Sequence, residues 1–247
     1  MSYENFASVY DSLQTDVDYD SRADYLLKLF KKYDRLPTLM LDVACGTGGF
    51  TLPFLKKGID VIGADPSPEM LNIAREKLLD NDYNALLLCQ SAENLDLYGT
   101  VDGAVCCLDS LNHITDADEL KRSIARIALF LEKDRLFIFD VNTEYKHQNV
   151  LSGAVFTAET EDCFCVWRNS ECNTDGVVDI SLDFFKENED GTYTRSFEDF
   201  SERAYSVDYI KECITAAGLE TIAVLGDLSF DAPIQEEQRI IFVTRRI

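Results

Sequence analysis

The stretch Leu-Met-Leu-Asp-Val-Ala-Cys-Gly-Thr-Gly-Gly at residues 39–49 decides the fold of this chain. An apolar run ends in the acid Asp42, a glycine turn follows through Gly46 and Gly48, and a helical pattern begins at Phe50. A strand, a glycine turn and a helix in this order place backbone N–H groups beside a bound nucleotide-like ligand. The stretch therefore predicts the first strand and helix of an α/β domain, with a ligand site at their junction.

A second acid narrows the choice of ligand. The next predicted strand, Ile59–Ala64, ends at Asp65, roughly 20 residues after Asp42, where a carboxylate can accept hydrogen bonds from a ribose diol. A dinucleotide site has the pattern G-x-G-x-x-G, but Thr51 occupies its last glycine position here, and the charge of Asp42 would repel a pyrophosphate. A nicotinamide-dependent oxidoreductase is therefore disfavoured. A ribose-bearing cation without phosphate, such as S-adenosylmethionine, suits the two carboxylates better.

The chain continues as alternating strands and helices. Apolar strands are predicted at Ala85–Cys89, Val101–Leu108 and Leu136–Val141, and helices at Arg22–Tyr33, after the Ser67 cap, and from the Asp116 cap to about Leu131. The Leu136–Val141 strand is almost wholly apolar, as expected of a strand that is buried on both faces. This alternation predicts a parallel, doubly wound sheet.

The alternation of strands and helices stops between residues 150 and 205. Turn sequences rich in Asn, Asp and Gly separate three predicted strands, which form an antiparallel meander: Thr157–Arg168, Val177–Lys186 and Thr192–Tyr205. A helix and two last strands follow at Ser206–Ala217, Leu219–Gly226 and Arg239–Arg245. The sequence thus predicts one α/β domain from residues 1–149 and 206–247, and an inserted antiparallel module at 150–205.

From about Leu39 to its end, the chain resembles the class I S-adenosylmethionine-dependent methyltransferases. The resemblance rests on the glycine turn, on Asp42 and Asp65, and on the inserted meander. It implies an α/β fold: a doubly wound, seven-stranded, mostly parallel Rossmann-like sheet with helices on both faces, its last strand antiparallel and beside the fifth. A small antiparallel β insertion after the fifth strand would cover the substrate. S-adenosyl-L-methionine is the implied cofactor, and methylation by a transferase is the implied activity.

Ligands of open α/β sheets bind outside the carboxyl ends of the strands, so the cofactor-binding residues are expected there. Gly46 and Gly48 would let the backbone approach the methionine part of the cofactor, and Asp42 would orient its amino group. Asp65 would take the ribose hydroxyls. These assignments place the glycine turn and both acids on one ligand.

The adenine is expected farther along the same edge of the sheet. Pro66 and Met70 would pack against it. Many relatives have an acid at the third strand end for the adenine amino group, whereas this chain has Ser91. Three neighbours at these strand ends complete the expected cofactor-binding set: Cys45, Ala92 and Leu108.

The first residues carry Tyr3, Phe6, Tyr10 and Leu13 on one face of a short predicted helix. This face could dock on the core. The resemblance adds a second possibility, because a segment of the form Tyr-x-x-Phe-Ala-x-x-Tyr-Asp often closes over the cofactor in these enzymes. Tyr3 and Tyr10 would then present ring faces to the sulfonium.

Catalytic candidates lie in the loop after the fourth strand, Asp109-Ser110-Leu111-Asn112-His113. Asp109 and Asn112 either face the substrate or cap the loop, since both residue types hydrogen-bond turns. His113 could act as a general base near neutral pH, or it could equally cap the loop. Methyl transfer depends mainly on positioning, so no further catalytic machinery is required. Second-line candidates are Asp140, Asn142, Trp167 and Arg168.

The composition of the chain limits the chemical class of the methyl acceptor. The 247 residues carry 23 Lys and Arg against 45 Asp and Glu, a formal charge of −22, which repels nucleic acids and anionic membranes. A small-molecule acceptor methylated at N or O is therefore favoured over RNA, and a non-catalytic S-adenosylmethionine-binding module is the alternative. The eight cysteines lack zinc-site spacing, and no metal is expected. Without a long apolar run or a signal-peptide pattern, we expect a cytoplasmic protein, monomeric or homodimeric.

Overall fold

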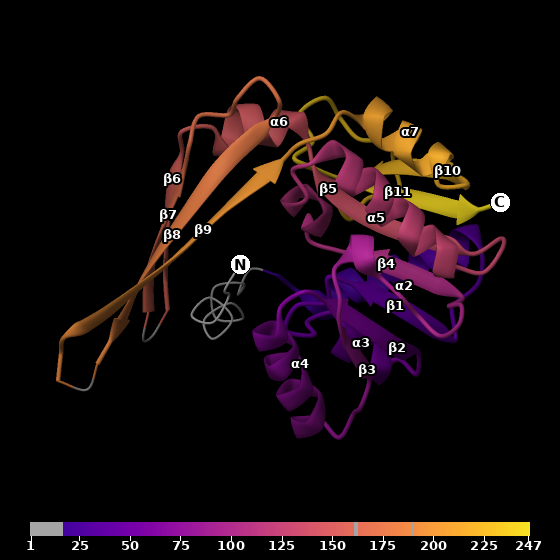
Figure 1. Cartoon of the computed structure of the whole chain (residues 1–247), viewed down its shortest axis with the longest axis horizontal. Coiled ribbons are helices and arrows are strands. Elements are labelled where there is room, and N and C mark those ends of the chain that lie inside the picture. The colour runs from indigo at the N-terminus through magenta and orange to yellow at the C-terminus, as the bar shows by residue number, and fades with distance from the viewer. Residues whose placement is uncertain (1–16, 161–162, 189) are drawn as a thin grey trace.

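The computed structural model describes residues 17–160, 163–188 and 190–247. Two sheets organise this part of the chain, a large one inside the α/β domain and a smaller one that extends from its side (Figure 1). Within the described ranges, no helix has the length and apolar character needed to cross a membrane.

The large sheet has seven strands in the order β10-β11-β5-β4-β1-β2-β3. All neighbours pair in parallel except β11, which runs antiparallel to both β10 and β5. The predicted seven-stranded, mostly parallel sheet with an antiparallel last strand beside the fifth is therefore confirmed. Its strands are β1 (Leu39–Val43), β2 (Asp60–Asp65), β3 (Leu86–Cys89), β4 (Gly103–Cys106), β5 (Leu136–Asn142), β10 (Leu219–Gly226) and β11 (Arg239–Arg246).

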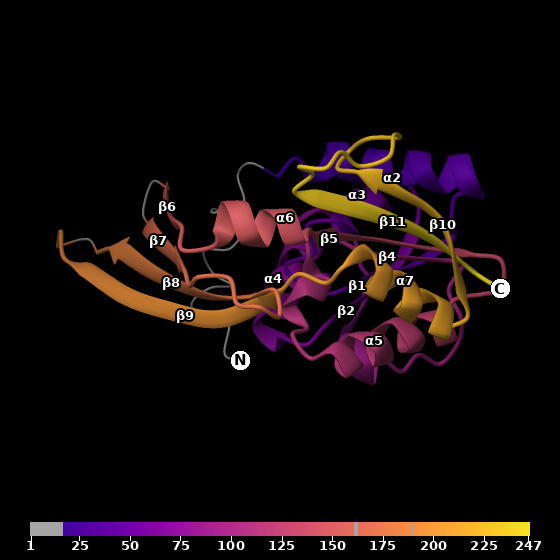
Figure 2. The ribbon, with the colours of Figure 1, turned by 90° about the horizontal axis from the view of Figure 1, so that it is seen from above.

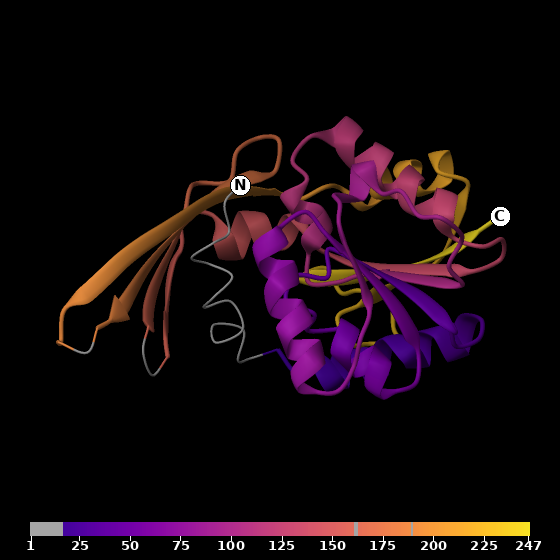
Figure 3. The ribbon, with the colours of Figure 1, turned by 60° about the horizontal axis from the view of Figure 1, so that its bottom comes forward.

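Helices cover both faces of this sheet (Figure 3). One face carries α2 (Tyr19–Tyr33), α3 (Thr51–Lys56) and α4 (Pro68–Asp80), and the other carries α5 (Ala117–Phe130) and α7 (Val207–Ala216). The central strands are buried throughout, since every residue of β4 and β5 is buried. Two separate apolar cores, one on each face, result from this arrangement.

The second sheet follows β5 in the chain. A short helix, α6 (Glu144–Lys146), and a π-helical turn, η3 (His147–Leu151), lead into four antiparallel strands that extend away from the large sheet (Figures 1 and 2). Their order is β6-β7-β8-β9, and an apolar core of their own lies mainly under β7 and β8. The strands are β6 (Val155–Glu159), β7 (Cys163–Asn169), β8 (Val177–Glu187) and β9 (Tyr193–Arg203).

The prediction of a single strand over Thr157–Arg168 is wrong. The chain reverses after β6, and the Thr160 N–H donates to the carbonyl of Cys163 at 2.8 Å across the start of the hairpin. The sequence has no Gly, Pro or Asn at this position to mark a turn. The antiparallel insertion after the fifth strand is present, with four strands instead of three.

Candidate active site

The glycine turn after β1 makes an open concave surface at the carboxyl end of the sheet. Gly46 and Gly48 have positive φ angles of 53° and 78°, which an L side chain adopts only with strain. A Cβ atom on Gly46 would meet nothing within 4 Å, whereas one on Gly48 would lie 3.3 Å from the Cβ of Ala74 in α4. Gly46 therefore exposes backbone to a ligand, and Gly48 allows close helix packing.

Asp42 lies beneath this turn and is only 2% exposed. The Thr51 hydroxyl donates to its carboxylate at 2.6 Å, so the residue that replaces the dinucleotide-type glycine is a hydrogen-bond partner of the acid. Burial, opposed by the Thr51 hydrogen bond and assisted by Asp65, raises the pKa of Asp42 to about 7. A cationic ligand group nearby would favour its ionised form.

Asp65 joins the end of β2 to the glycine turn. Its two carboxylate oxygens accept hydrogen bonds at 2.9 Å, one from the Gly46 N–H and the other from the Ser67 N–H. Burial raises the pKa of Asp65, although both backbone hydrogen bonds act in the opposite direction. Each oxygen keeps a free lone pair, so the carboxylate is fixed in place and can still accept from a ribose diol.

A small cavity lies directly against Asp42 and Gly46, where the sequence predicts the methionine part of the cofactor. Carboxylate, backbone and aromatic groups surround it. Carboxylates and aromatic ring faces attract cations, so the cavity suits a cationic ligand that carries no phosphate. Its walls include Tyr19, Asp42, Cys45, Gly46, Phe50 and Leu108.

The residues assigned to the adenine lie beside this cavity, at the ends of β2 and β3. Pro66 is exposed and Met70 is buried at the first turn of α4, while Ser91 and Ala92 are half-buried. The Ser91 hydroxyl accepts a hydrogen bond from Asn94 at 2.9 Å. Their role toward adenine stays a prediction. Tyr3 and Tyr10 lie outside the described residues.

A second, larger cavity of about 500 Å³ separates the strand ends of the large sheet from the inserted sheet. One side is polar, with charged or titratable groups; the other is apolar and aromatic, contributed by the inserted sheet. The polar residues are Arg22, Asp109, His113, Lys146, Glu202 and Arg239, and the apolar ones include Phe156, Trp167, Leu182 and Phe200. Leu108 borders both cavities, so the two meet at the end of β4.

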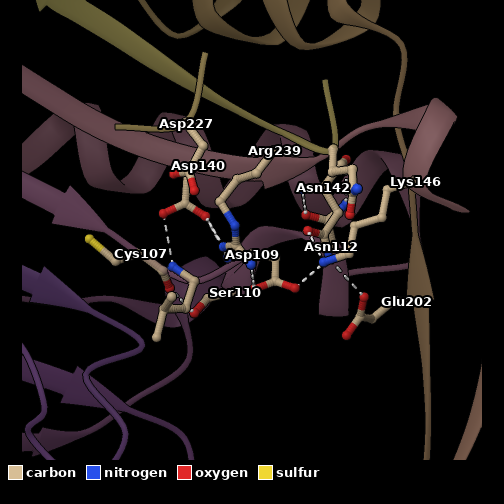
Figure 4. A network of polar contacts seen from close by, with 12 residues as sticks. Cys107, Asp109, Ser110, Asn112, Asp140, Asn142, Lys146, Glu202, Asp227 and Arg239 are labelled. Atoms are coloured by element: carbon tan, nitrogen blue, oxygen red, sulfur yellow. Dashed lines mark hydrogen bonds and ion pairs between the residues drawn. The ribbon is translucent and has the colours of Figure 1, made fainter. Parts of the chain in front are cut away.

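The loop after β4 is strained and held by ion pairs (Figure 4). Leu108 and Asp109 both have positive φ angles, 55° and 53°, and their N–H groups donate to the Asp140 carboxylate at 2.9 and 2.7 Å. Arg239 then donates to Asp140 at 2.5 Å and to Asp109 at 2.9 Å. Strain of this kind persists where the surroundings fix it, often at functional sites. Asp140 thus positions the loop that reaches the cavity.

Asp109 faces the large cavity as an ionised group. Burial opposes its ionisation, but Arg239, Lys146 and His113 outweigh burial and lower the pKa of Asp109 to about 2. The Asn142 side-chain amide also donates to this carboxylate. Asp109 therefore presents a fixed negative charge next to Leu108, the residue that borders both cavities.

The structure does not place Asn112 toward the substrate. Its side chain is 1% exposed, and its amide donates to the carbonyls of Asn142 at 3.2 Å and Arg203 at 2.8 Å. Its side-chain oxygen accepts from the Asn142 N–H at 2.9 Å. All of its hydrogen-bonding groups thus join the loop to β5 and β9, and we correct its predicted substrate-facing role to a structural one.

His113 lines the large cavity, and its ring packs 5.1 Å from that of Phe200. Enclosure by the cavity walls lowers the pKa of its imidazole, while Asp109 and Asp65 act in the opposite direction. A neutral imidazole that faces an acceptor cavity can accept a proton. Its geometry is compatible with the predicted general base.

Four charged cavity residues were missed by sequence reasoning: Arg22, Lys146, Glu202 and Arg239. Glu202 shares one face of β9 with Glu198 and Phe200, but the opposite face also carries aromatic residues, so alternation alone does not identify the buried face. Lys146 and Arg239 have no local sequence signal that would assign them to the cavity. They join the site because α6 and the start of β11 lie at the same edge of the sheet as the Asp109 loop.

Comparison with known proteins identifies the family that the sequence resembles. A family model described as “Methyltransferase domain” matches residues 40–134. A Geobacillus sp. (strain WCH70) protein named as a “putative methyltransferase” is 31% identical over 247 residues, which cover 100% of both chains. The crystal structure of an S-adenosylmethionine-dependent methyltransferase from Clostridium acetobutylicum superposes with a TM-score of 0.89 at 30% identity, over 99% of this chain and 98% of that one.

The chain therefore belongs to the S-adenosylmethionine-dependent methyltransferases, and S-adenosylmethionine is its cofactor. A more distant relative is a glycine/sarcosine N-methyltransferase from Parasynechococcus marenigrum, 30% identical over 145 residues, or 56% of this chain and 49% of that protein.

Proposed function

We propose that this enzyme transfers a methyl group to a nitrogen or oxygen of a small molecule bound in the large cavity. The observation that carries the proposal is the cavity itself, about 500 Å³, which meets the cofactor cavity at Leu108 and is covered by the inserted sheet. This volume lies within the usual range for small-molecule sites.

The division of the cavity into two sides indicates the kind of acceptor. Phe156, Trp167 and Phe200 supply an aromatic side that would pack against a carbon skeleton, while Asp109 and His113 lie on the polar side. A nucleophile on the polar side would be next to Leu108 and hence to the cofactor. Bound S-adenosylmethionine supplies an electrophilic methyl group on a sulfonium. The chain has to position the nucleophile, exclude water and accept a proton.

Two observations bear on the class of acceptor. The formal charge of −22 weakens contact with a nucleic-acid backbone, which disfavours RNA. The name of the Parasynechococcus relative describes methyl transfer to the nitrogen of small amino acids, which is consistent with a small acceptor here. The Asp109 carboxylate and the neutral His113 suit an amine, which must lose a proton, as well as a hydroxyl compound.

The test is a transfer assay with S-adenosylmethionine that carries a deuterated methyl group. The purified enzyme is offered small amines and hydroxyl compounds, total RNA and a protein extract, and the labelled products are identified by mass spectrometry. We expect label in a small molecule, and at least about a 10² loss of rate in His113→Gln. Glu198→Gln is the control, because this acid lies on the same cavity-facing side of the inserted sheet but does not line the cavity.

Three other outcomes would contradict the proposal. Label found only in RNA would identify a nucleic-acid methyltransferase, and label only in protein a protein methyltransferase. Cofactor binding without transfer to any of these acceptors would instead support the non-catalytic binding module.

A further inference from the structure

The chain contains two histidines, and both approach the same buried carboxyl group. The Nε2 atom of His113 lies 3.7 Å from Glu202 Oε1, and the Nε2 atom of His147 lies 3.7 Å from Glu202 Oε2. The three residues come from separate elements: the turn after β4, η3 and β9. Only the fold brings them together, with Glu202 between the two histidines and with His113 and Glu202 both lining the cavity.

Burial increases from the cavity inward along this series. His113 lines the large cavity, Glu202 is 5% exposed and His147 is 0% exposed. The Nδ1 atom of His147 lies 3.0 Å from the Gly176 carbonyl oxygen, which can only accept a hydrogen bond, so Nδ1 carries the hydrogen. The Nε2 atom therefore has a lone pair directed toward Glu202. Within the described part of the chain, no hydrogen-bond partner of this atom is found.

The surrounding charges favour a neutral carboxyl group at Glu202. Burial and the negative charge of Asp109 raise the pKa of Glu202 to about 8, against the opposing effects of Lys146, of the Asn142 amide at 3.3 Å and of Arg239. Burial also lowers the pKa of both imidazoles. Near neutral pH, the two neutral imidazoles thus lie on either side of one protonated carboxyl group. Figure 4 shows Glu202 beside Lys146 and Asn142.

We propose that His113, Glu202 and His147 form a proton relay that removes the acceptor's proton from the cavity. This inference rests on the proposed function, since a proton is released when a protonated nitrogen or a hydroxyl is methylated. The bond from the nucleophile to the methyl carbon forms as the carbon–sulfur bond breaks, and that electron pair stays on sulfur. His113 then accepts the proton of the nucleophile at Nδ1.

The remaining steps pass one proton inward. His113 gives its Nε2 proton to Glu202 Oε1, and the proton on Glu202 Oε2 moves to the lone pair of His147. One proton enters the series and one is held by His147, so the protons balance. The distances of 3.7 Å are longer than hydrogen bonds, as is often the case before substrate binds, when catalytic contacts are still loose.

A metal site is a poorer explanation of the same residues. No group of three or more His, Cys, Asp or Glu residues suited to a metal is found among the described residues.

The test is an NMR titration of the imidazole protons between about pH 5 and pH 9, which needs no acceptor. Two histidines give two signals, and His113→Gln assigns them. In the native enzyme we expect each imidazole signal to show a second inflection near pH 8, where Glu202 ionises beside both rings. In Glu202→Gln this inflection should disappear from both signals, whereas the imidazole pKa values should change little, because Glu202 is uncharged at the pH where the imidazoles titrate. Glu198→Gln, a buried acid on the same face of β9, should leave both titrations unchanged.

A second variant guards against loss of folding in Glu202→Gln. His147→Gln should move the second inflection of the His113 signal to lower pH, because the protonated Glu202 carboxyl group loses the imidazole lone pair that faces it, and binding of S-adenosylhomocysteine shows that each variant is folded. Independent titrations in the native enzyme, or an unchanged His113 signal in both variants, would overturn the relay. Label found only in RNA would overturn the proposed function and would leave these titrations as they are, so the two failures are distinguishable.

Once an acceptor is identified, the relay also predicts a kinetic signature. Glu202→Gln should lower kcat about 10-fold or more with little change in the KM for S-adenosylmethionine, and should shift the pH profile of kcat. An unchanged pH profile would show that Glu202 has only a structural role.

Discussion

Asp65 is the residue on which the cofactor site most depends, because it accepts backbone hydrogen bonds from both sides of that site. Its oxygens hold the Gly46 and Ser67 N–H groups at 2.9 Å and present the remaining lone pairs to the ligand. In Asp65→Asn, one oxygen becomes an NH₂ group that opposes one of these N–H donors. Hydrogen bonds to charged groups contribute about 1.5–3 kcal/mol, so we expect S-adenosylmethionine and S-adenosylhomocysteine to bind roughly 10–100-fold more weakly.

Isothermal titration calorimetry measures this change. Asp60→Asn, at the exposed start of the same strand, is the matched control and should bind normally. Equal affinities in the native enzyme and Asp65→Asn would refute the assignment of Asp65 to the ribose.

Asp42 gives the ligand-free enzyme a pH-dependent stability. Its pKa rises from an ordinary 3.8 to about 7 in the fold, so the folded state holds this proton more tightly than the unfolded state does. The stabilisation is complete below about pH 4 and is lost as the pH rises through 7, to a total on the order of 4 kcal/mol. Asp42→Asn keeps the oxygen that accepts from Thr51 and cannot ionise. Between pH 5 and 8, its urea midpoint should therefore fall less than that of the native enzyme. An identical fall of the midpoint with pH in both proteins would contradict this account.

At the scale of elements, the N-terminus of α4 supports the cofactor site. The Ser67 hydroxyl accepts from the Met70 N–H at 3.2 Å, and its own N–H donates to Asp65. Asp116 caps α5 in the same way, accepting from the Glu119 N–H at 2.7 Å, but α5 lies on the other face of the sheet from α4. Loss of either cap should cost about 1 kcal/mol of stability.

The two caps should differ in their effect on binding. We expect Ser67→Ala to weaken S-adenosylhomocysteine binding by about three- to ten-fold, because a looser first turn of α4 releases Asp65, whereas Asp116→Ala should leave the affinity unchanged. Thermal melts and calorimetry on both variants separate the two effects. Equal affinities in the two variants would show that the α4 cap serves stability alone.

At the scale of the whole molecule, the two sheets have separate cores, and the proposed acceptor cavity lies between them. The inserted sheet has its own apolar cluster, which includes Val178, Ile180 and Phe184, and it supplies the aromatic side of the large cavity. Replacing residues 152–203 by a Gly-Ser linker should keep S-adenosylhomocysteine affinity within about 10-fold and abolish methyl transfer.

A shorter deletion is the control for this experiment. Joining Phe185 to Arg195, which pair across β8 and β9, by an Asn-Gly turn removes only the hairpin tip and should preserve both activities. If the folded linker variant no longer binds S-adenosylhomocysteine, residues 150–205 are not a separable module.

The sequence by itself determined the class of fold and the cofactor. The Leu39–Gly49 stretch and the acids at the ends of β1 and β2 act through local geometry, because a strand, a turn and a helix adjacent in the chain need few other residues to fix them. The alternating pattern of strands and helices likewise predicted the large sheet. The β6–β7 hairpin was missed because no Gly, Pro or Asn marks the reversal at Thr160, and the short helical turns α6 and η3 were missed as well.

The tertiary structure alone decided the composition of the acceptor cavity. Glu202 meets His113 and His147 across separations of 89 and 55 residues, and Arg239 meets Asp109 across 130. Contacts over such distances leave no local pattern, because each partner occupies an ordinary position in its own element. For the same reason Asn112, which looks like a substrate ligand in its loop, proves to be the residue that joins this loop to β5 and β9.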